Sequence, residues 1–433
     1  MKRTFYNTLL EWEEHKTREP LMVVGARQVG KTYIIREFCE KMYSDYLYIN
    51  LEKQSEYIEI FSGNLAPEKI IRELEILSGC KLSEETAIFI DEIQQSEDAI
   101  TALKYFCEAE TNYRIICAGS LLGVKLNRFH SSFPVGKVVI KQMYPMSFRE
   151  FLTACGESLL MEAIGESLQR RKPLSAAVHE KALKLYHDYL FVGGMPKAVG
   201  NYLAQNYNVA HIDEGLLSDL VTSYLADMTK YTTSPAEGVK IQEVYRSIPR
   251  QLAHENPKFK YKEVRTHATK RDFMLPVDWL VSAQMVWKVN KCDFAQTPLS
   301  VYEDADSFKL YLSDVGILSR QSGMQYRNLS SSVDNLFKGV IAENFVIQQM
   351  APQLNGLYYF KPDQSMEVDL LLDTKDGLIP LEIKAGRHRR STSLKNYRKK
   401  YNPPYAYRLS ENNIGETDSL RSIPIYAAEW IEV

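Results

Sequence analysis

The chain carries two hydrophobic periods, one typical of buried strands and one typical of helices that cover them. Leu21 to Val24 form a short apolar run bounded by proline and glycine, which indicates a buried parallel strand. Residues 33–43 then place apolar side chains at helical spacing. Residues 87–90 and 113–118 are further short apolar runs. Short strands separated by helical patterns predict an α/β core with a parallel sheet.

The loop between the first strand and its helix reads GARQVGKT. Strand, glycine loop and helix are the context that the phosphate-binding pattern G-x-x-x-x-G-K-[ST] requires. Glycines let backbone amides turn toward a phosphate, and the helix adds its positive N-terminal end. Lys31 is expected to contact the β- and γ-phosphates of ATP, and the Thr32 hydroxyl to ligate Mg²⁺. The residues predicted to bind the nucleotide are Gly25, Ala26, Arg27, Gln28, Val29, Gly30, Lys31 and Thr32.

Two acids follow the strand that begins at Ala87, in the segment AIFIDEIQQ. Asp91 is expected to hold the water shell of Mg²⁺, and Glu92 to orient and deprotonate the attacking water. A third strand, YRIICAGS, ends at Ser120, which either caps a turn or contacts the γ-phosphate. The paired acids predict a nucleotide hydrolase rather than a passive nucleotide binder.

Several motifs resemble one known family. GARQVGKT, FIDEIQ and AGS, followed by YPMSFREF at residues 144–151 and FVGGMP at residues 191–196, resemble the bacterial and archaeal AAA+-type ATPases with an uncharacterised C-terminal domain. The resemblance runs through nearly the whole chain in the same order. It implies an AAA+ core with a helical lid, ATP and Mg²⁺ as ligands, and Ser120 in the first-sensor position.

The sequence departs from that family at Gly136-Lys137, where an arginine usually follows the glycine. Lysine is a point charge and lacks the two-pronged contact of an arginine finger. Arg128 and Arg149 are the other candidates, and each is also typical of a surface or structural position. The arginine finger, and the homo-oligomer that it would complete, stay open at this point.

The middle of the chain changes from a helical pattern to a mixed one. Residues 168–226 read as helices, which fits a lid. Residues 233–320 read as helices followed by two strands around a turn, the parts of a winged helix that binds DNA or docks a protein. The segment Lys258 to Arg271 holds six basic residues against one glutamate, which favours phosphate contacts, although such a stretch is also typical of a solvated face.

A second group of acids lies in the C-terminal region, beyond a linker near Ser330. Glu343 projects from an apolar stripe of a predicted helix, and a buried acid is costly unless it is paired or on a metal. The segment EVDLLLDTKDGLIPLEIKAG predicts a hairpin with strands at Glu367 to Leu372 and Ile379 to Lys384. Alternation places Glu382 and Lys384 on one face, with Asp369 alongside.

This order of a helix Glu, a strand Asp and a strand Glu-x-Lys resembles the PD-(D/E)XK nuclease superfamily. Asp369 and Glu382 would ligate Mg²⁺, Glu343 would support the metal or its water, and Lys384 would position the water or offset phosphorane charge. Eight basic residues from Lys384 to Tyr401 favour a phosphate-tracking helix, with Tyr397 and Tyr401 stacking on bases. The alternative is an ordinary strand whose Glu and Lys pair across the hairpin, or a degenerate domain that binds without cutting.

Composition sets outer limits on these interpretations. The net charge of −2 excludes a protein that coats nucleic acid over its whole surface. No apolar run reaches the length of a membrane span, and the N-terminus is too charged for a secretory signal, so a cytoplasmic protein is expected. Six single cysteines with no C-x-x-C pair predict reduced thiols and no zinc.

The expected fold class is α/β, with four parts. They are a P-loop parallel-sheet AAA+ core at residues 1–165, a helical lid at 166–232, a winged-helix-like domain at 233–329 and a PD-(D/E)XK nuclease-like domain at 330–433. The hypothesis is that ATP binding and hydrolysis switch how the C-terminal domain engages DNA. The alternatives are a nucleotide switch that docks a protein partner, and a nuclease whose ATP module is only regulatory.

Overall fold

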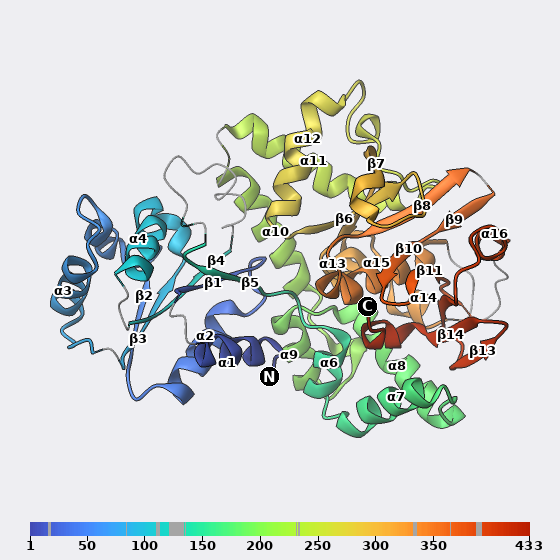
Figure 1. Cartoon of the computed structure of the whole chain (residues 1–433), viewed down its shortest axis with the longest axis horizontal. Helices are drawn as coiled ribbons and strands as arrows, with labels where there is room; N and C mark the ends of the chain where they lie inside the picture. Colours follow the sequence, from blue (N-terminus) through green and yellow to red (C-terminus); the bar gives the residue numbers. More distant parts are fainter. Residues whose placement is uncertain are drawn as a thin grey trace. The chain divides into compact units, whose positions relative to one another are not determined.

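The computed structural model divides into two compact units, Met1–Tyr144 with Ser282–Gln284, and Pro145–Val281 with Met285–Val433 (Figure 1). It describes residues 1–15, 19–83, 85–109, 113–120, 134, 136–230, 232, 234–331, 336–363, 365–386 and 392–433. Within these residues, no helix is both long and apolar enough to cross a bilayer.

The first unit is built on a five-stranded parallel sheet with strand order β2-β3-β4-β1-β5. Its strands are β1 (Leu21–Val24), β2 (Tyr46–Asn50), β3 (Ala87–Asp91), β4 (Arg114–Gly119) and β5 (Val139–Gln142). Its helices are α1 (Phe5–Glu14), α2 (Lys31–Met42), α3 (Pro67–Ser78) and α4 (Glu97–Glu108), with the short helices η1 (Ser55–Tyr57), η2 (Glu59–Phe61) and η3 (Ile93–Gln95). The prediction of a parallel α/β core is confirmed.

The apolar runs of the sequence explain why β1 and β3 lie inside this sheet. Every residue of both strands is buried, as expected where helices cover a parallel sheet on both faces. Because β1 pairs with β4 on one side and β5 on the other, the loop after β1 leaves the sheet at its carboxyl edge between two neighbours. That edge is where ligands bind in open α/β sheets.

The first part of the second unit is helical, as the sequence predicts. Its helices up to the strands are α6 (Phe148–Ala154), α7 (Ser158–Arg170), α8 (Ala176–Val192), α9 (Pro196–Ala204), η4 (Val209–His211), α10 (Gly215–Lys230), α11 (Pro235–Leu252), η5 (Tyr261–Glu263) and α12 (Lys270–Ser282). Later helices are η6 (Leu299–Tyr302), α13 (Val315–Gln321), α14 (Tyr326–Ser330), α15 (Leu336–Met350), η7 (Ala351–Gln353), α16 (Thr392–Tyr401) and η8 (Ile425–Trp430).

The glycine pair of FVGGMP lies against a buried aspartate. A Cβ on Gly193 would collide with the carboxylate of Asp314, and the Gly194 amide donates a 2.6 Å hydrogen bond to Asp314 Oδ2. Asp314 Oδ1 also accepts from the Ile317 amide and so caps α13. Burial raises the pKa of Asp314 to about 6. This motif therefore fixes the packing of α8 against α13.

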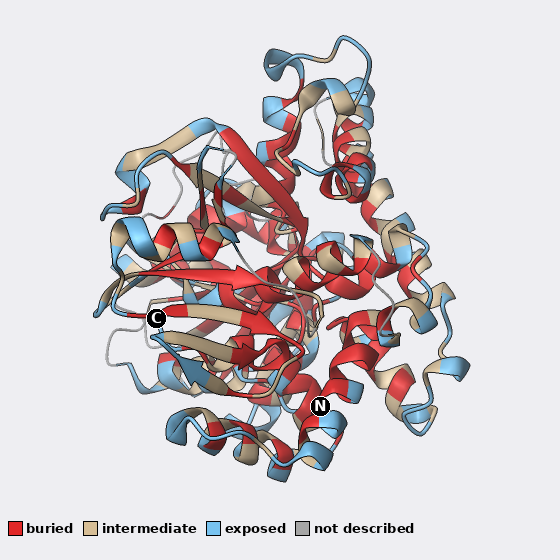
Figure 2. Ribbon diagram, turned by 90° about the vertical axis from the view of Figure 1, so that its right-hand side faces the viewer, coloured by how far each residue is buried: buried red, intermediate tan, exposed pale blue. Residues whose placement is uncertain are grey.

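Two sheets form the rest of the second unit. One has the order β7-β6-β8-β9, with β6 (Val286–Cys292), β7 (Glu303–Leu312), β8 (Tyr358–Asp363) and β9 (Met366–Val368). The other has the order β10-β11-β12-β14-β13, with β10 (Leu370–Thr374), β11 (Gly377–Ile383), β12 (Ala406–Ser410), β13 (Gly415–Thr417) and β14 (Leu420–Pro424). Figure 2 shows buried residues along parts of these strands, whereas strand ends and strand β13 carry exposed residues.

The first of these sheets crosses the expected boundary at residue 330. Strand β6 pairs antiparallel with β7 and parallel with β8, so strands from both sides of that boundary share one set of hydrogen bonds. The four-part division of the chain stays a prediction, but its third and fourth parts are joined through this sheet.

The predicted C-terminal hairpin is present, with one correction. Strands β10 and β11 pair antiparallel, with Leu370 opposite Leu381. The expected single strand from Glu367 to Leu372 is wrong, because the chain leaves one sheet after Val368 and enters the other at Leu370. Asp369 lies at this crossing, where its Oδ2 accepts a 2.7 Å hydrogen bond from the Ile383 amide.

Candidate functional site

The loop from Gly25 to Thr32 bends sharply between β1 and α2. A Cβ on Gly25 would collide with the carbonyl oxygen of Met143, so only glycine fits there. Gln28 and Gly30 have positive φ angles of 65° and 100°, and Gly30 is the N-cap of α2. The loop therefore turns back over the N-terminal end of the helix, as a phosphate-binding loop must.

Lys31 is buried within this loop and is held by uncharged partners. Its Nζ donates hydrogen bonds of 2.8 Å to the Gly25 carbonyl and 2.9 Å to the Ala26 carbonyl. Burial lowers the pKa of Lys31 to about 8, although Glu92 and Asp91 oppose the shift. A cation bound only to carbonyls in a buried place gains strongly from an anionic ligand such as a phosphate.

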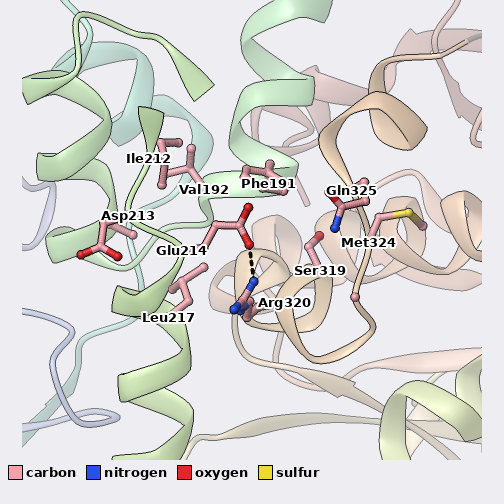
Figure 3. A pocket seen from close by; sticks show the side chains of 12 residues that line it. Phe191, Val192, Ile212, Asp213, Glu214, Leu217, Ser319, Arg320, Met324 and Gln325 are labelled. Atoms are coloured by element: carbon pink, nitrogen blue, oxygen red, sulfur yellow. Dashed lines mark hydrogen bonds and ion pairs between the residues drawn. The ribbon is translucent and has the colours of Figure 1, made fainter. Parts of the chain in front are cut away.

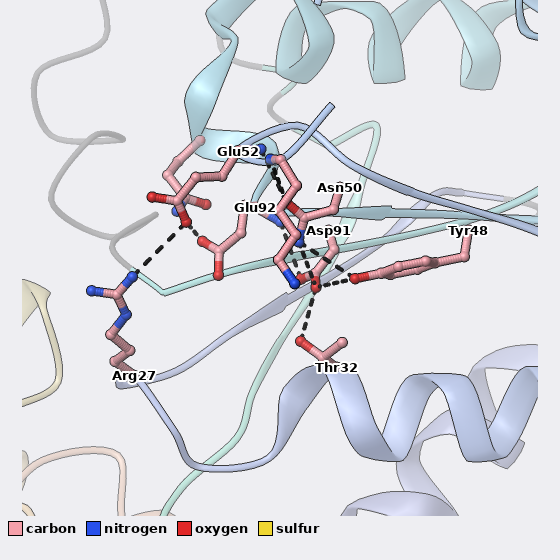
Figure 4. A network of polar contacts seen from close by, with 9 residues as sticks. Arg27, Thr32, Tyr48, Asn50, Glu52, Asp91 and Glu92 are labelled. Atoms are coloured by element: carbon pink, nitrogen blue, oxygen red, sulfur yellow. Dashed lines mark hydrogen bonds and ion pairs between the residues drawn. The ribbon is translucent and has the colours of Figure 1, made fainter. Parts of the chain in front are cut away.

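Thr32 and Asp91 meet across the edge of the sheet (Figure 4). The Thr32 hydroxyl donates a 2.9 Å hydrogen bond to Asp91 Oδ2. The same oxygen accepts from the Tyr48 hydroxyl at 3.1 Å and from the Asn50 amide at 3.3 Å. A hydroxyl beside a buried carboxylate is a hard-oxygen donor set, and it fits Mg²⁺.

Glu92 follows Asp91 in a strained backbone conformation. Its φ angle is 52°, and its amide donates a 3.1 Å hydrogen bond to Asp91 Oδ1. Gln94 donates a hydrogen bond to Glu92 Oε2, and burial raises the pKa of Glu92. Left-handed backbone in a non-glycine residue costs on the order of 1 kcal/mol and is concentrated at functional sites. Figure 4 also shows Arg27 facing Glu52, 3.9 Å away.

Ser120 lies just beyond β4 and is buried. The register places Gly119 beside Val24, so Ser120 and Gly25 leave neighbouring strands at the same edge. The structure therefore brings Ser120 to the edge that carries the loop. Its contact with a γ-phosphate stays a prediction.

The candidates for an arginine finger fall in different places. Arg128 lies outside the described residues. The Lys137 ammonium is 3.9 Å from the Glu108 carboxylate, and the Arg149 guanidinium covers the Trp430 ring at 5.0 Å. Arg149 thus has a packing role, and the identity of an arginine finger stays open.

Arg3 supports the loop, and sequence reasoning did not identify it. Its two terminal nitrogens donate 2.7 Å hydrogen bonds to the carbonyls of Val29 and Tyr144. Arg3 is buried despite its place in a charged N-terminal segment. The partners lie 26 and 141 residues away, so no local sequence pattern predicts these contacts.

The C-terminal acids line one pocket, as the sequence predicts. Glu343 comes from α15, Asp369 from the crossing between β9 and β10, and Glu382 from β11, with Lys384 just after it. The pocket also contains Lys309 and Glu367, which the sequence did not single out. The cluster thus mixes acids and amines from five segments.

Glu382 keeps one carboxylate oxygen without a partner. It is 3% exposed; Oε1 lies 2.8 Å from the Lys384 ammonium, whereas Oε2 is buried and makes no hydrogen bond. Glu382 on β11 therefore pairs with Lys384, the residue just after that strand, and not with a residue across the hairpin. A buried orphan oxygen is costly, and a bound cation would satisfy it.

Asp369 and Glu343 complete the acidic side of this pocket. Burial, reinforced by the Glu343 carboxylate, raises the pKa of Asp369 to about 7, while Lys309 and Lys384 oppose the shift. Glu343 Oε2 accepts a 2.8 Å hydrogen bond from the Tyr311 hydroxyl. Across the described part of the chain, no three acid, histidine or cysteine side chains form a ready metal cluster. Magnesium commonly binds through one or two carboxylates with water and phosphate oxygens, so Asp369 and Glu382 fit as a pair.

Tyr397, one of the two tyrosines in the C-terminal basic run, is not available for stacking. Tyr397 is 1% exposed and packs on Phe360, with ring centroids 5.8 Å apart. Tyr401 is half-buried beside both rings. The prediction that Tyr397 stacks on bases is wrong, because the apolar face of α16 uses it as core. Arg387 to Arg390, the centre of that run, lie outside the described residues.

Several basic side chains of the middle basic cluster, Lys258 to Arg271, are paired with side chains of the protein itself. Arg265 pairs with Glu243, Lys270 pairs with Asp306, and Lys258 donates a 2.7 Å hydrogen bond to the Ser307 hydroxyl. Lys262 and Arg271 are exposed. The cluster therefore offers fewer charges to a phosphate backbone than its composition indicates.

A second, small pocket lies among α8, α10 and α13 (Figure 3). Phe191, Ile212, Leu217 and Met324 supply most of its apolar lining. Two of its charged groups, Arg320 and Glu214, point toward each other and form an ion pair. A third, Asp213, also lines it.

The sheet order, the loop after β1 and the acid pair after β3 define the first unit as an AAA-type P-loop NTPase domain. In agreement, residues 17–152 match the family described as AAA domain. Residues 183–328 match a domain of unknown function, DUF8612, and residues 338–427 match another, DUF4143. No curated protein sequence matches the chain.

Several solved structures share a weak similarity. The Walker-type ATPase PABY2304 of Pyrococcus abyssi is 13% identical, with a TM-score of 0.44 over 73% of this chain and 94% of that protein. The Aeropyrum pernix ORC1 protein, solved in complex with DNA, is 11% identical, with a TM-score of 0.31 over 75% and 91%. The Aeropyrum pernix ORC2 protein is 11% identical, with a TM-score of 0.33 over 76% and 92%.

Proposed function

We propose that the first unit binds and hydrolyses ATP with Mg²⁺, and that its nucleotide state controls a nucleic-acid site in the C-terminal region. The observation that carries the first half is the 2.9 Å hydrogen bond between Thr32 and Asp91. It places the loop hydroxyl and the strand acid together, as metal-dependent phosphoryl transfer requires.

The residues of this site have separate roles in the proposed reaction. Lys31 would exchange its two carbonyl partners for the β- and γ-phosphates, and the loop amides would hold the β-phosphate. Glu92 would orient the attacking water and accept its proton, and a raised pKa makes it a better base than an exposed glutamate. When bound, Mg²⁺ would offset phosphate charge beside Thr32 and Asp91.

The second half rests on the convergence of Glu343, Asp369, Glu382 and Lys384 in one pocket. Asp369 and the free oxygen of Glu382 would hold a divalent cation, with Glu343 beside them. Lys384 would contact the phosphate or hold the water that attacks it. When bound, the cation would polarise a phosphodiester. The chemistry that this set supports best is binding, and hydrolysis, of a nucleic-acid phosphodiester.

The middle region would supply additional contacts to the nucleic acid. The order of α11 and α12 followed by the antiparallel pair β6 and β7 supports the proposal of a winged-helix-like region. The pocket is also lined by His254, Glu255 and Pro257, which directly precede the middle basic cluster. Lys262 follows these pocket-lining residues closely in the chain, so a nucleic-acid strand bound in the pocket would also contact exposed Lys262. The cluster residues whose charges are already paired would contribute less.

A second candidate is a nucleotide switch that docks a protein partner. The internal pairing of Arg265 with Glu243 and of Lys270 with Asp306 favours it, because those charges are already compensated. In that case the C-terminal pocket would be a scaffold without turnover. The two candidates share the ATP site and differ only in what the second unit binds.

ATP binding is tested with Lys31→Ala, which removes the buried ammonium. We expect loss of ATP binding and hydrolysis, measured by calorimetry and by phosphate release. Lys41→Ala is the matched control, because Lys41 lies on the same helix and pairs with surface Glu37 at 2.6 Å. If Lys31→Ala still hydrolysed ATP, the assignment of residues 25–32 as a phosphate-binding loop would be contradicted.

Cleavage is tested on linear, branched and single-stranded DNA with Mg²⁺ or Mn²⁺, with and without ATP. We expect cleavage by the wild type that is lost in Glu382→Gln and Lys384→Ala. Absence of cleavage with retained DNA binding would leave a binding site without turnover. Absence of both would favour the protein-docking switch. Cleavage unchanged in Lys31→Ala would make the ATP module regulatory only.

A further inference from the structure

Strand β7 places Lys309 in the lining of the C-terminal pocket and Tyr311 against Glu343, an acid that lines it. Lys309 and Tyr311 are two residues apart, so they lie on the same face of the strand. They are 2% and 3% exposed, which leaves their polar groups dependent on protein partners. Each finds an acid from a different segment, Glu367 for Lys309 and Glu343 for Tyr311.

Tyr311 fixes one oxygen of the helix acid. Its hydroxyl donates a 2.8 Å hydrogen bond to Glu343 Oε2. A carboxylate held through one oxygen by a rigid phenol keeps its other oxygen in a defined direction. Groups that hold a ligand carboxylate in this way typically change metal affinity 10- to 100-fold when they are removed.

Lys309 binds Glu367, an acid of the same pocket that would otherwise compete for the cation. Its Nζ lies 3.1 Å from Glu367 Oε1, and Lys361 binds Glu367 Oε2 at 2.6 Å. The Lys309 ammonium also sits over the Tyr359 ring, 4.9 Å from its centroid. Both oxygens of Glu367 are therefore occupied by ammonium groups, although Glu367 lines the pocket together with Asp369 and Glu382.

We propose that Tyr311 and Lys309 are positioning residues of the C-terminal site, through which the β6–β7 hairpin is part of that site. Tyr311 orients Glu343 toward the cation, and Lys309 withholds Glu367 from it. This inference rests on the proposed divalent-cation site at Asp369 and Glu382. It adds that the site is assembled from both sides of residue 330.

The two residues should shift cation binding in opposite directions. Tyr311→Phe keeps the ring and removes only the hydroxyl, so Glu343 loses its orientation and Mn²⁺ binding weakens at least tenfold. Lys309→Met removes a positive charge and frees an oxygen of Glu367, so Mn²⁺ binds at least as tightly as in the wild type. Lys309→Arg retains the charge and should restore wild-type behaviour.

The measurement is Mn²⁺ binding to the full-length chain by calorimetry and electron paramagnetic resonance, together with thermal unfolding with and without Mn²⁺. Tyr405→Phe is the matched control, because Tyr405 donates a 3.1 Å hydrogen bond to Asp376, which is not among the residues that line the pocket. It should bind Mn²⁺ as the wild type does. If DNA is cleaved, Tyr311→Phe should be rescued in part by excess Mn²⁺, whereas Lys309→Met should not.

The outcomes separate this inference from the proposed function. If wild type and Glu382→Gln bind Mn²⁺ equally, the cation site itself is absent. If Glu382→Gln loses Mn²⁺ but Tyr311→Phe binds like the wild type, the site stands and the role of Tyr311 is overturned. If Lys309→Met and Tyr311→Phe weaken binding alike, the role of Lys309 in withholding Glu367 is overturned.

Discussion

Thr32 and Asp91, 59 residues apart in the chain, share a 2.9 Å hydrogen bond at the carboxyl edge of the parallel sheet. The same Asp91 oxygen accepts from Tyr48 and Asn50, so three donors converge on it. An oxygen with three hydrogen-bond donors is held in place before any nucleotide arrives. Because Asp91 is held independently of Glu92, the role of Glu92 in hydrolysis can be tested separately from nucleotide binding.

Glu92→Gln should bind ATP with wild-type affinity and hydrolyse it 10²- to 10⁴-fold more slowly. The amide preserves size and polarity but cannot accept the proton of the attacking water. Binding is measured by calorimetry and turnover by phosphate release. Glu37→Gln is the control, because Glu37 pairs with surface Lys41 at 2.6 Å and should turn over near the wild-type rate. An unchanged rate in Glu92→Gln would move the base to another residue.

ATP affinity should depend on pH through Lys31. Its pKa of about 8 in the free protein means that the ammonium is charged below pH 8 and loses its proton above it. Bound phosphates favour the charged form and raise that pKa, so binding takes up a proton above pH 8. The dissociation constant should be flat from pH 7 to about 8 and then rise by up to about tenfold per pH unit. A flat profile to pH 9.5 would contradict this assignment.

Asp369→Asn should stabilise the cation-free protein. Because the pKa of Asp369 rises to about 7 on folding, the native state holds a proton that the unfolded state releases near pH 4. Wild-type stability therefore falls as pH rises from 4 to 7, and asparagine removes that loss. The gain above pH 7 is at most about 4 kcal/mol. It is measured by urea unfolding.

The same variant should lose the response to divalent cations. Mg²⁺ or Mn²⁺ should stabilise the wild type more at pH 8 than at pH 6, because cation and proton compete for Asp369. Asp373→Asn is the control, since Asp373 is exposed on β10, the strand that begins directly after Asp369, and should behave as the wild type in both tests. An Asp369→Asn protein that unfolds at lower urea concentration at pH 8 would contradict the prediction.

DNA binding, if present, should depend unequally on the middle basic cluster. Lys262 and Arg271 are exposed. Changing either to alanine should reduce the slope of the logarithm of the DNA-binding constant against the logarithm of the salt concentration by about one. Lys270→Ala should change it less, because Lys270 already pairs with Asp306. Fluorescence anisotropy over a salt series measures these slopes. A slope near zero in the wild type would exclude the cluster as the contact surface.

The parts of the fold and site that could be predicted from the sequence are those encoded over short distances. The loop before Lys31, the acids at Asp91 and Glu92, and the alternation that sets Glu382 beside Lys384 each depend on a few consecutive residues. Their local spacing fixes where the backbone points them. The structure accordingly brings each group together, one at the edge of the parallel sheet and one in the C-terminal pocket.

The contacts that could not be predicted join distant segments or depend on packing. Tyr311 reaches Glu343 across 32 residues, and Lys309 reaches Glu367 across 58. Neither contact follows from a local spacing in the sequence. The burial of Tyr397 was missed because a tyrosine on a basic helix suits either a surface or a core, and only the position of Phe360 decides between them.

The pairing of β6 with β8 determines which fragments of the chain could exist alone. A fragment beginning at residue 330 would leave β8 with its inner edge bare, exposing unpaired amides and carbonyls where β6 normally lies. Such an edge invites pairing between copies, so that fragment should aggregate or need a partner strand. A break after Tyr144 cuts none of these ladders, although it separates Ser282–Gln284 from the rest of the first unit.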